Sequence, residues 1–136
     1  MILSKIVELL LKKIKSRFGE NIARIVTECT DNKSIIKADR KRAQIIHMNS
    51  PDMLYESKLV KLADKYSNLS TLLTDPPTTW SREFIIGSVY WSYAVCKPVL
   101  RSNEGLAAMA VKLFDELSTN LGIDFDIYKN NLSEEV

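Results

Sequence analysis

Apolar residues recur every three or four positions through most of this 136-residue chain, and glycine or proline separates the runs. This spacing puts the apolar side chains on one face of an α-helix. The first run extends from Leu3 to Phe18 and stops at Gly19, a residue type that commonly ends helices. No stretch alternates apolar and polar residues over five positions, as a half-buried strand does. The spacing therefore predicts an all-α fold with about six helices.

The same spacing predicts helices over the next segments. A short apolar stripe covers residues 22–29, and residues 30–34 read as a turn, because Asp and Asn side chains hydrogen-bond to their own backbone there. The third helix is expected from Lys37 to about His47. Pro51 suits the first turn of the fourth helix, because the fixed φ of proline matches a helix start. That helix is expected to carry residues 54–73.

Two further helices are expected before residue 122. Ser81 and Asn103 have the right type and position for N-caps, because their side-chain oxygens can accept a hydrogen bond from the first helical turn. Pro98 is expected to end or kink the fifth helix, and Gly122 is expected to end the sixth. We therefore expect one domain over residues 1–122 and a polar tail over residues 123–136.

Composition and charge exclude several classes of protein. Nineteen Lys and Arg against seventeen Asp and Glu give a net charge of +2, which is too small for a dedicated nucleic-acid binder. No apolar run reaches the roughly 18 to 20 residues that a membrane-spanning helix needs. Cys29 and Cys96 are too far apart for a zinc motif, and reduced thiols are typical of the cytoplasm. We expect a cytoplasmic protein with neither a nucleic-acid nor a membrane partner.

The helix expected over residues 54–73 carries a row of polar side chains. Asp64 and Asn68 are one turn apart and share a helix face, and Lys61 and Thr71 extend the row. Together they could hold a metal ion, a ribose hydroxyl and a phosphate. The alternative is the hydrated side of an amphipathic helix. Neither the single histidine, His47, nor any glycine-rich phosphate loop adds a separate catalytic signal.

A basic cluster marks the start of the third expected helix. Cations at a helix N-terminus oppose the helix dipole, so their presence there favours an anionic ligand such as a phosphate. Only Asp39 offers local compensation, and the alternative is a solvated face. The cluster consists of Lys33, Lys37, Arg40, Lys41 and Arg42.

Three segments of the chain resemble, in order, the small animal ppGpp hydrolases, which are metazoan relatives of the bacterial stringent-response hydrolases in the HD-domain superfamily. The segments read TECTDNKSIIKADRKRAQ, SKLVKLADKYSNLSTLL and PPTTWSREFIIGSVYW. The resemblance begins near Phe18 and continues to about Leu121. It implies an HD-domain-like helical bundle, here truncated at its N-terminus.

The resemblance also implies an activity and a set of site residues. The family binds a divalent metal, usually manganese, and hydrolyses ppGpp to GDP and pyrophosphate, and its animal members also dephosphorylate NADPH. Asp64 matches the last metal ligand of the family, and Asn68 and Thr71 match positions beside the nucleotide. Lys37 matches a lysine that faces the phosphates. A guanine nucleotide or NADPH is therefore the implied partner.

The chain departs from the family where the rest of the metal site should lie. Met1 and Ile2 stand where the family has its His-Asp pair, and an earlier histidine of the family would precede the chain. Lys5 and Ile6 stand where the family has two carboxylates that position the attacking water. A single carboxylate does not hold manganese against bulk water. We therefore assign no catalytic residue, and we expect that the chain as it stands retains neither the manganese ion nor the activity.

Two interpretations stay open. The chain is either a fragment of an active hydrolase, whose upstream helices would restore the metal site, or a non-catalytic paralogue that binds nucleotides or regulates a relative. Ser88, which replaces an aromatic residue often found near the substrate's base in the family, is a milder departure. Apolar surface that absent helices would cover also leaves self-association open.

Overall fold

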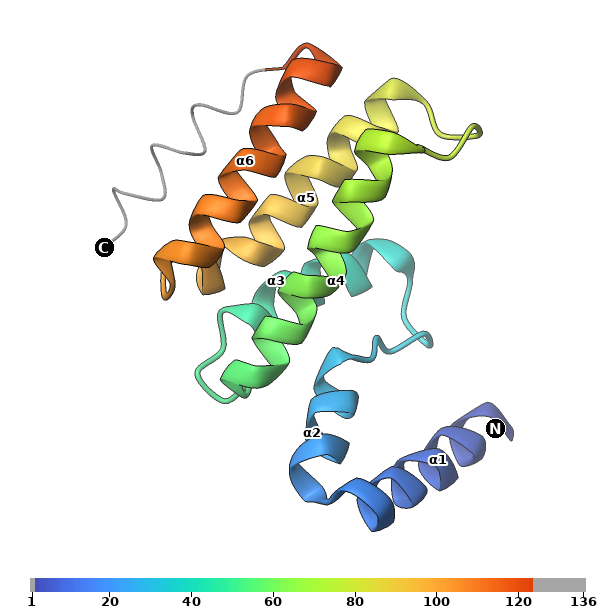
Figure 1. Ribbon diagram of the computed structural model, residues 1–136. Coiled ribbons are helices and arrows are strands. Elements are labelled where there is room, and N and C mark those ends of the chain that lie inside the picture. The colour runs from blue at the N-terminus through green and yellow to red at the C-terminus, as the bar shows by residue number, and fades with distance from the viewer. Residues whose placement is uncertain (1, 124–136) are drawn as a thin grey trace. The chain divides into compact units, whose positions relative to one another are not determined.

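The computed structural model describes residues 2–123, and within that range it contains six α-helices and no strand (Figure 1). The prediction of an all-α fold with about six helices is confirmed. The chain divides into two compact units, residues 1–60 and residues 61–136. Nothing tests the expected tail, because residues 124–136 lie outside the described range. No helix within residues 2–123 is both long and apolar enough to span a bilayer.

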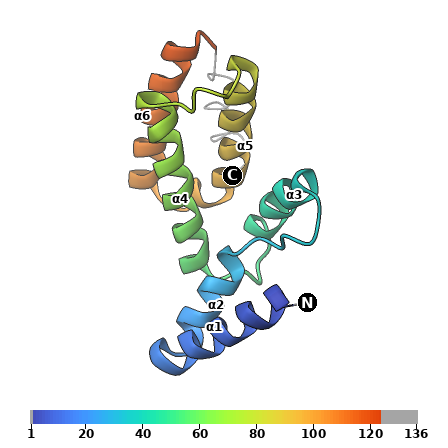
Figure 2. The same ribbon diagram turned by 90° about the vertical axis from the view of Figure 1, so that its right-hand side faces the viewer.

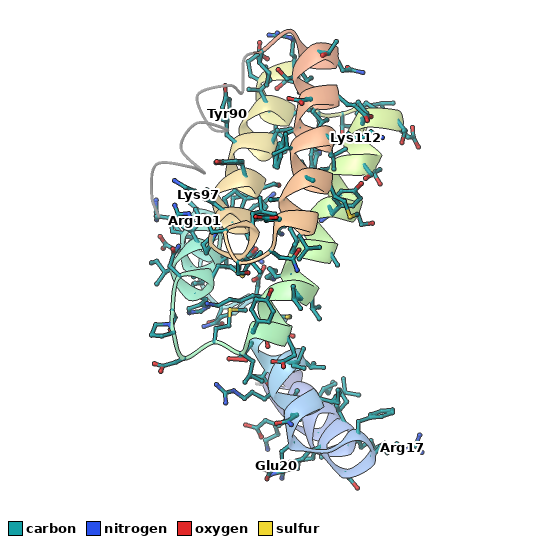
Figure 3. The ribbon with its side chains drawn as sticks, turned by 60° about the vertical axis from the view of Figure 1, so that its left-hand side comes forward. Arg17, Glu20, Tyr90, Lys97, Arg101 and Lys112 are labelled. Carbon is teal, nitrogen blue, oxygen red and sulfur yellow. The ribbon has the colours of Figure 1, made fainter. Side chains whose placement is uncertain are left out.

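The first unit contains α1 (Ile2–Phe18), α2 (Glu20–Cys29) and α3 (Lys37–Met48). Gly19 separates α1 from α2 with a φ of 90°, a left-handed value that glycine adopts without the clash of a side chain. Arg17 and Glu20 lie on either side of this turn (Figure 3). The predicted end of the first helix at Gly19 is confirmed, and so is the start of the third helix at Lys37.

The apolar stripe of α1 is largely exposed. Leu11 and Ile14 are half-buried, whereas Leu10 is 53% exposed and Phe18 is 65% exposed. The spacing of apolar residues thus predicted the helix correctly, but it did not predict how little of that face is covered.

A residue near the end of α2 forms hydrogen bonds with the start of α4 (Tyr55–Thr74). A carboxylate oxygen of Glu28 accepts hydrogen bonds from the backbone N–H of Leu54 at 3.2 Å and from the hydroxyl of Ser57 at 2.9 Å. Glu28 thereby satisfies polar groups at the first turn, as a local cap would. The placement of Pro51 in that first turn was wrong: the proline lies in the preceding turn, because the helix begins only at Tyr55.

The second unit contains α4 from Lys61 onward, α5 (Arg82–Leu100) and α6 (Glu104–Leu121). α5 and α6 run antiparallel and side by side (Figures 1 and 2). Between them, the rings of Tyr93 and Phe114 meet edge to face with their centroids 5.4 Å apart. The core of this unit consists of nearly fully buried side chains: Leu62, Leu69, Val89, Tyr93, Val95, Cys96, Val99, Leu100, Ala110, Leu113, Phe114 and Leu117.

The predicted caps of α5 and α6 are confirmed. The Ser81 hydroxyl oxygen accepts a hydrogen bond from the N–H of Phe84 at 3.1 Å, and Oδ1 of Asn103 accepts one from the N–H of Leu106 at 3.0 Å. Gly122 ends α6 with a φ of 67°. These side chains and this glycine satisfy backbone groups that a helix leaves unpaired at its ends.

Pro98 does not end α5. The helix continues for two residues beyond it, through Val99 and Leu100, which are 1% and 2% exposed. Burial of these two side chains holds the last turn in place although proline provides no backbone N–H.

Candidate functional site

The second unit presents three of the predicted site residues on one face of α4. Asp64, Asn68 and Thr71 follow at intervals of four and three positions, and all three are exposed. Residues at these intervals are neighbours on a helix surface. The side chain of Asp64 is 54% exposed. One ligand could therefore contact a carboxylate, an amide and a hydroxyl from a single helix.

The exposed row is shorter than the sequence suggested. Lys61, which was expected to extend it, is only 7% exposed and so does not share the solvent-facing surface. The hydroxyl of Thr71 donates a hydrogen bond to the carbonyl oxygen of Ser67 at 3.2 Å, which leaves its lone pairs as acceptors. The face consists of Asp64, Asn68 and Thr71, and we call it the α4 face.

Sequence reasoning missed Lys65, which lies directly behind the α4 face. Its side chain is 6% exposed, and its Nζ lies 3.4 Å from Oδ2 of Asp64 and 4.3 Å from the ring centroid of Trp91 on α5. Lysines are rarely buried unless they are paired. Its spacing of three residues from Leu62 and four from Leu69 places it on the apolar face of α4, but spacing alone does not distinguish a buried lysine from one that reaches solvent.

Cys96 on α5 belongs to the same environment and is 1% exposed. Burial raises the pKa of the Cys96 thiol to about 12, while the nearby Lys65 lowers the pKa and Asp64 raises it. A thiol with such a pKa is uncharged at neutral pH and is a poor nucleophile and metal ligand. Cys96 is therefore a core residue and not a reactive one.

Lys37, the fourth predicted site residue, belongs to the first unit. It is exposed at the first position of α3, and Ile36 at the N-cap contributes no side-chain hydrogen bond. Within the basic cluster, Arg42 forms an ion pair with Asp39, so part of the cluster's charge is compensated locally. The predicted site residues thus come from two units: Lys37 from the first and the α4 face from the second.

Two polar atoms of α3 are buried without a hydrogen-bond partner among the described residues: Nε of Arg40 and Oε1 of Gln44. The amide nitrogen of Gln44 donates to both carboxylate oxygens of Asp31, at 2.9 and 2.8 Å, so the orientation of the amide is fixed. Arg40 and Gln44 are one helical turn apart. A water molecule or a polar ligand could satisfy both atoms.

The donors around Asp64 do not fit a divalent cation. In the described part of the chain, no group of three His, Cys, Asp or Glu side chains is placed to hold a metal ion. The ammonium of Lys65 lies against the Asp64 carboxylate and has no lone pair to offer. Asn68 could add one amide oxygen. Such a set falls well short of the roughly six oxygen ligands that hard divalent cations take.

His47 lies in the first unit, beside a hollow of about 240 Å³ that Glu28, Ser50, Asp52 and Met53 also line. The Glu28 carboxylate is already engaged, since it caps the start of α4 and lies 3.6 Å from the guanidinium of Arg24. Glu28 is therefore not available as a partner for His47, and we assign no catalytic role to His47.

The sequence and the fold are both similar to those of known enzymes. Guanosine-3′,5′-bis(diphosphate) 3′-pyrophosphohydrolase MESH1 of Danio rerio is 36% identical over 110 residues, which cover 81% of this chain and 60% of that protein. The Mus musculus protein of the same name is 35% identical over 111 residues, covering 82% and 61%. A solved structure of a metazoan ortholog of SpoT that hydrolyzes ppGpp superposes with a TM-score of 0.69 at 32% identity, covering 78% and 58%.

The alignment covers only part of each relative. The chain spans about three fifths of the length of these proteins. No protein-family model matches the sequence.

Proposed function

This chain is a homologue of the animal guanosine-3′,5′-bis(diphosphate) 3′-pyrophosphohydrolases. We therefore propose that it binds ppGpp at a site related to that of the enzymes that hydrolyse this nucleotide. The observation that carries the proposal is the α4 face, where Asp64, Asn68 and Thr71 are exposed within two turns of one helix. A carboxylate, an amide and a hydroxyl provide donors and acceptors for ribose hydroxyls and a guanine edge. ppGpp carries both, together with phosphates.

The functional groups of the site residues determine which part of the nucleotide each could bind. The Asn68 amide can donate and accept, and the Thr71 hydroxyl, which already donates to Ser67, can accept, so they would hold polar groups of the nucleoside. Lys37 lies in the first unit, and for it we propose, independently of the α4 face, a charge-assisted hydrogen bond to a phosphate. Asp64 would accept from a ribose hydroxyl, and in a chain that supplied the other ligands it would bind the manganese ion of the family.

Hydrolysis needs more than these groups. A water oxygen must bond to the phosphorus attached at the ribose 3′ position, the bond from that phosphorus to O3′ must break, and O3′ must gain a proton. A bound metal ion neutralises charge in such a step and makes its water more acidic. Since the donors around Asp64 do not fit a metal ion, we propose that these 136 residues bind ppGpp with little or no turnover.

The wider expectations belong to the same proposal. NADPH is a second candidate ligand, because it combines a ribose with phosphates as ppGpp does. Cys29 and Cys96 carry thiols and not a disulfide, which supports a reducing compartment such as the cytoplasm. The exposed apolar residues of α1, such as Leu10 and Phe18, support self-association. We propose no nucleic-acid partner.

An alternative function is regulation, in which nucleotide binding without turnover controls a full-length relative. The contact of 3.4 Å between Lys65 and Asp64 favours it, because an internal ammonium already compensates the charge of this carboxylate. The negative charge of Asp64 is therefore compensated without a bound metal ion.

The experiment that tests the proposal measures binding and turnover separately. The purified chain is titrated with ppGpp by calorimetry, and it is incubated with ppGpp and Mn²⁺ while released pyrophosphate is assayed. We expect saturable binding and no pyrophosphate above the blank. Asn68→Ala should weaken binding about tenfold, equivalent to roughly one hydrogen bond to a charged or polar ligand. Asn120→Ala, an exposed asparagine on α6, is the matched control and should change nothing.

Two results would contradict the proposal in different ways. Absence of ppGpp binding would remove the α4 face as a nucleotide site. Release of pyrophosphate that disappears in Asp64→Asn would instead show a working metal centre and overturn the expected lack of turnover.

A further inference from the structure

A lysine inside the second unit is held between two groups that both favour a positive charge. The Nζ of Lys65 lies 4.3 Å from the ring centroid of Trp91 and 3.4 Å from Oδ2 of Asp64, and 6% of the side chain is exposed. A charge that leaves water must be compensated. The negative face of the indole ring and the carboxylate both compensate it.

Helix geometry alone does not produce the contact between Lys65 and Asp64. Adjacent residues of a helix point about 100° apart and do not face each other. One oxygen of Asp64 is nevertheless turned back to the buried ammonium, while the side chain as a whole is 54% exposed. The Asp64 carboxylate therefore contacts the buried Lys65 ammonium through one oxygen, and it remains accessible to a ligand from the solvent side.

Trp91 determines where the ammonium can lie. It is on α5, one turn from Ser88 and from Val95, which are 8% and 0% exposed. The ring borders this buried side of α5 and is itself half-buried, so packing against its neighbours limits its movement. The ammonium is thus fixed relative to a packed surface, and not only relative to the neighbouring residue.

We infer that Lys65 is a positioning residue, anchored on Trp91, that sets the orientation of the Asp64 carboxylate within the α4 face. The inference rests on the proposed function, because the orientation of Asp64 matters only if the α4 face binds ppGpp. Lys65 itself lies in the core and acts through Asp64. No residue with this role was indicated by the resemblance to known hydrolases.

The test compares ppGpp affinity and tryptophan emission in a set of variants of the full chain. Lys65→Met removes the charge but keeps the length of the side chain, and replacing a buried cation by a hydrophobic residue of similar size is often tolerated by the fold. Lys65→Arg keeps a cation that can stack on an indole and pair with a carboxylate. Lys112→Met is the matched control, since Lys112 is an exposed lysine on α6 (Figure 3).

We expect Lys65→Met to weaken ppGpp binding about tenfold, as for one lost charge-assisted contact, and Lys65→Arg to restore affinity to within about threefold of the original. In an Asp64→Asn background Lys65→Met should have no further effect, because coupled residues are not additive. Equal affinities for Lys65→Met and Lys112→Met, or a full additional loss in the Asp64→Asn background, would overturn the inference.

A second measurement separates this inference from the proposed function. In a Trp80→Phe background Trp91 is the single tryptophan, and both Lys65→Met and Asp64→Asn should shift its emission, whereas Lys112→Met should not. If the unmodified chain fails to bind ppGpp, the proposed function fails. The emission then still tests Lys65: no shift in Lys65→Met or in Asp64→Asn would overturn the arrangement of the three residues.

Discussion

Leu69→Ala should destabilise the second unit by about 3 kcal/mol. Leu69 is 2% exposed, and it follows Asn68 directly, so its packing fixes the rotation of α4 that turns the α4 face to solvent. The substitution removes about three carbon atoms, worth roughly 0.8 kcal/mol each in transfer free energy, and leaves a cavity. Measured costs of such core substitutions are about 2–5 kcal/mol.

The assay follows from the position of the two tryptophans. Trp80 and Trp91 both belong to the second unit, so urea unfolding monitored by tryptophan fluorescence reports that unit. With a slope of about 1–2 kcal/mol per molar urea, a loss of about 3 kcal/mol lowers the midpoint by roughly 1.5–3 M. The slope itself should stay unchanged.

A control substitution isolates burial as the cause. Met109→Ala, in the same unit, removes a side chain that is 52% exposed. It should cost less than about 0.5 kcal/mol, as surface changes usually do. A loss below about 1 kcal/mol for Leu69→Ala, or one equal to that of Met109→Ala, would refute the reasoning.

Two other predictions concern pH and backbone conformation. Burial raises the pKa of Cys96 from 9.0 to about 12, so between these pH values the unfolded chain loses a proton that the folded chain keeps. Stability should therefore fall as pH rises above 9, by at most about 1.4 kcal/mol per pH unit from this group. Cys96→Ala should flatten that slope in urea midpoints, and an unchanged slope would contradict it. Gly87→Ala should raise the melting temperature, because the added Cβ on helix α5 meets nothing within 4 Å and glycine costs a helix about 1 kcal/mol. Gly122→Ala should lower it, because φ is +67° there. In circular-dichroism melts, a fall for Gly87→Ala would contradict the first argument and a rise for Gly122→Ala the second.

Helix boundaries could be predicted because their signals are local. Gly19, Ser81, Asn103 and Gly122 act through their own backbone conformation or through a hydrogen bond within three residues. The start of the fourth helix was predicted wrongly because it involves a residue distant in sequence. The start of α4 depends on Glu28, which is 26 residues from Leu54, and such a contact leaves no trace in local spacing.

The candidate site was predictable to the same extent. The spacing of Asp64, Asn68 and Thr71 required only a helix to place them on one face. Lys65 was not predictable in this way, because a lysine between polar residues is ordinarily exposed. Its burial depends on Trp91, which lies on a different helix.

The electrostatics of the α4 face depend on where the charges lie more than on how many there are. The overall charge of +2 argues against a nucleic-acid partner, but it neither favours nor disfavours binding of a mononucleotide. From Lys61 to Lys65, α4 has two lysine residues that are only 7% and 5% exposed, and between them an exposed carboxylate. Charges away from water are screened less than charges at the surface. Asp64 is therefore an exposed acceptor beside buried cationic side chains, which suits a ligand that presents donor hydroxyls.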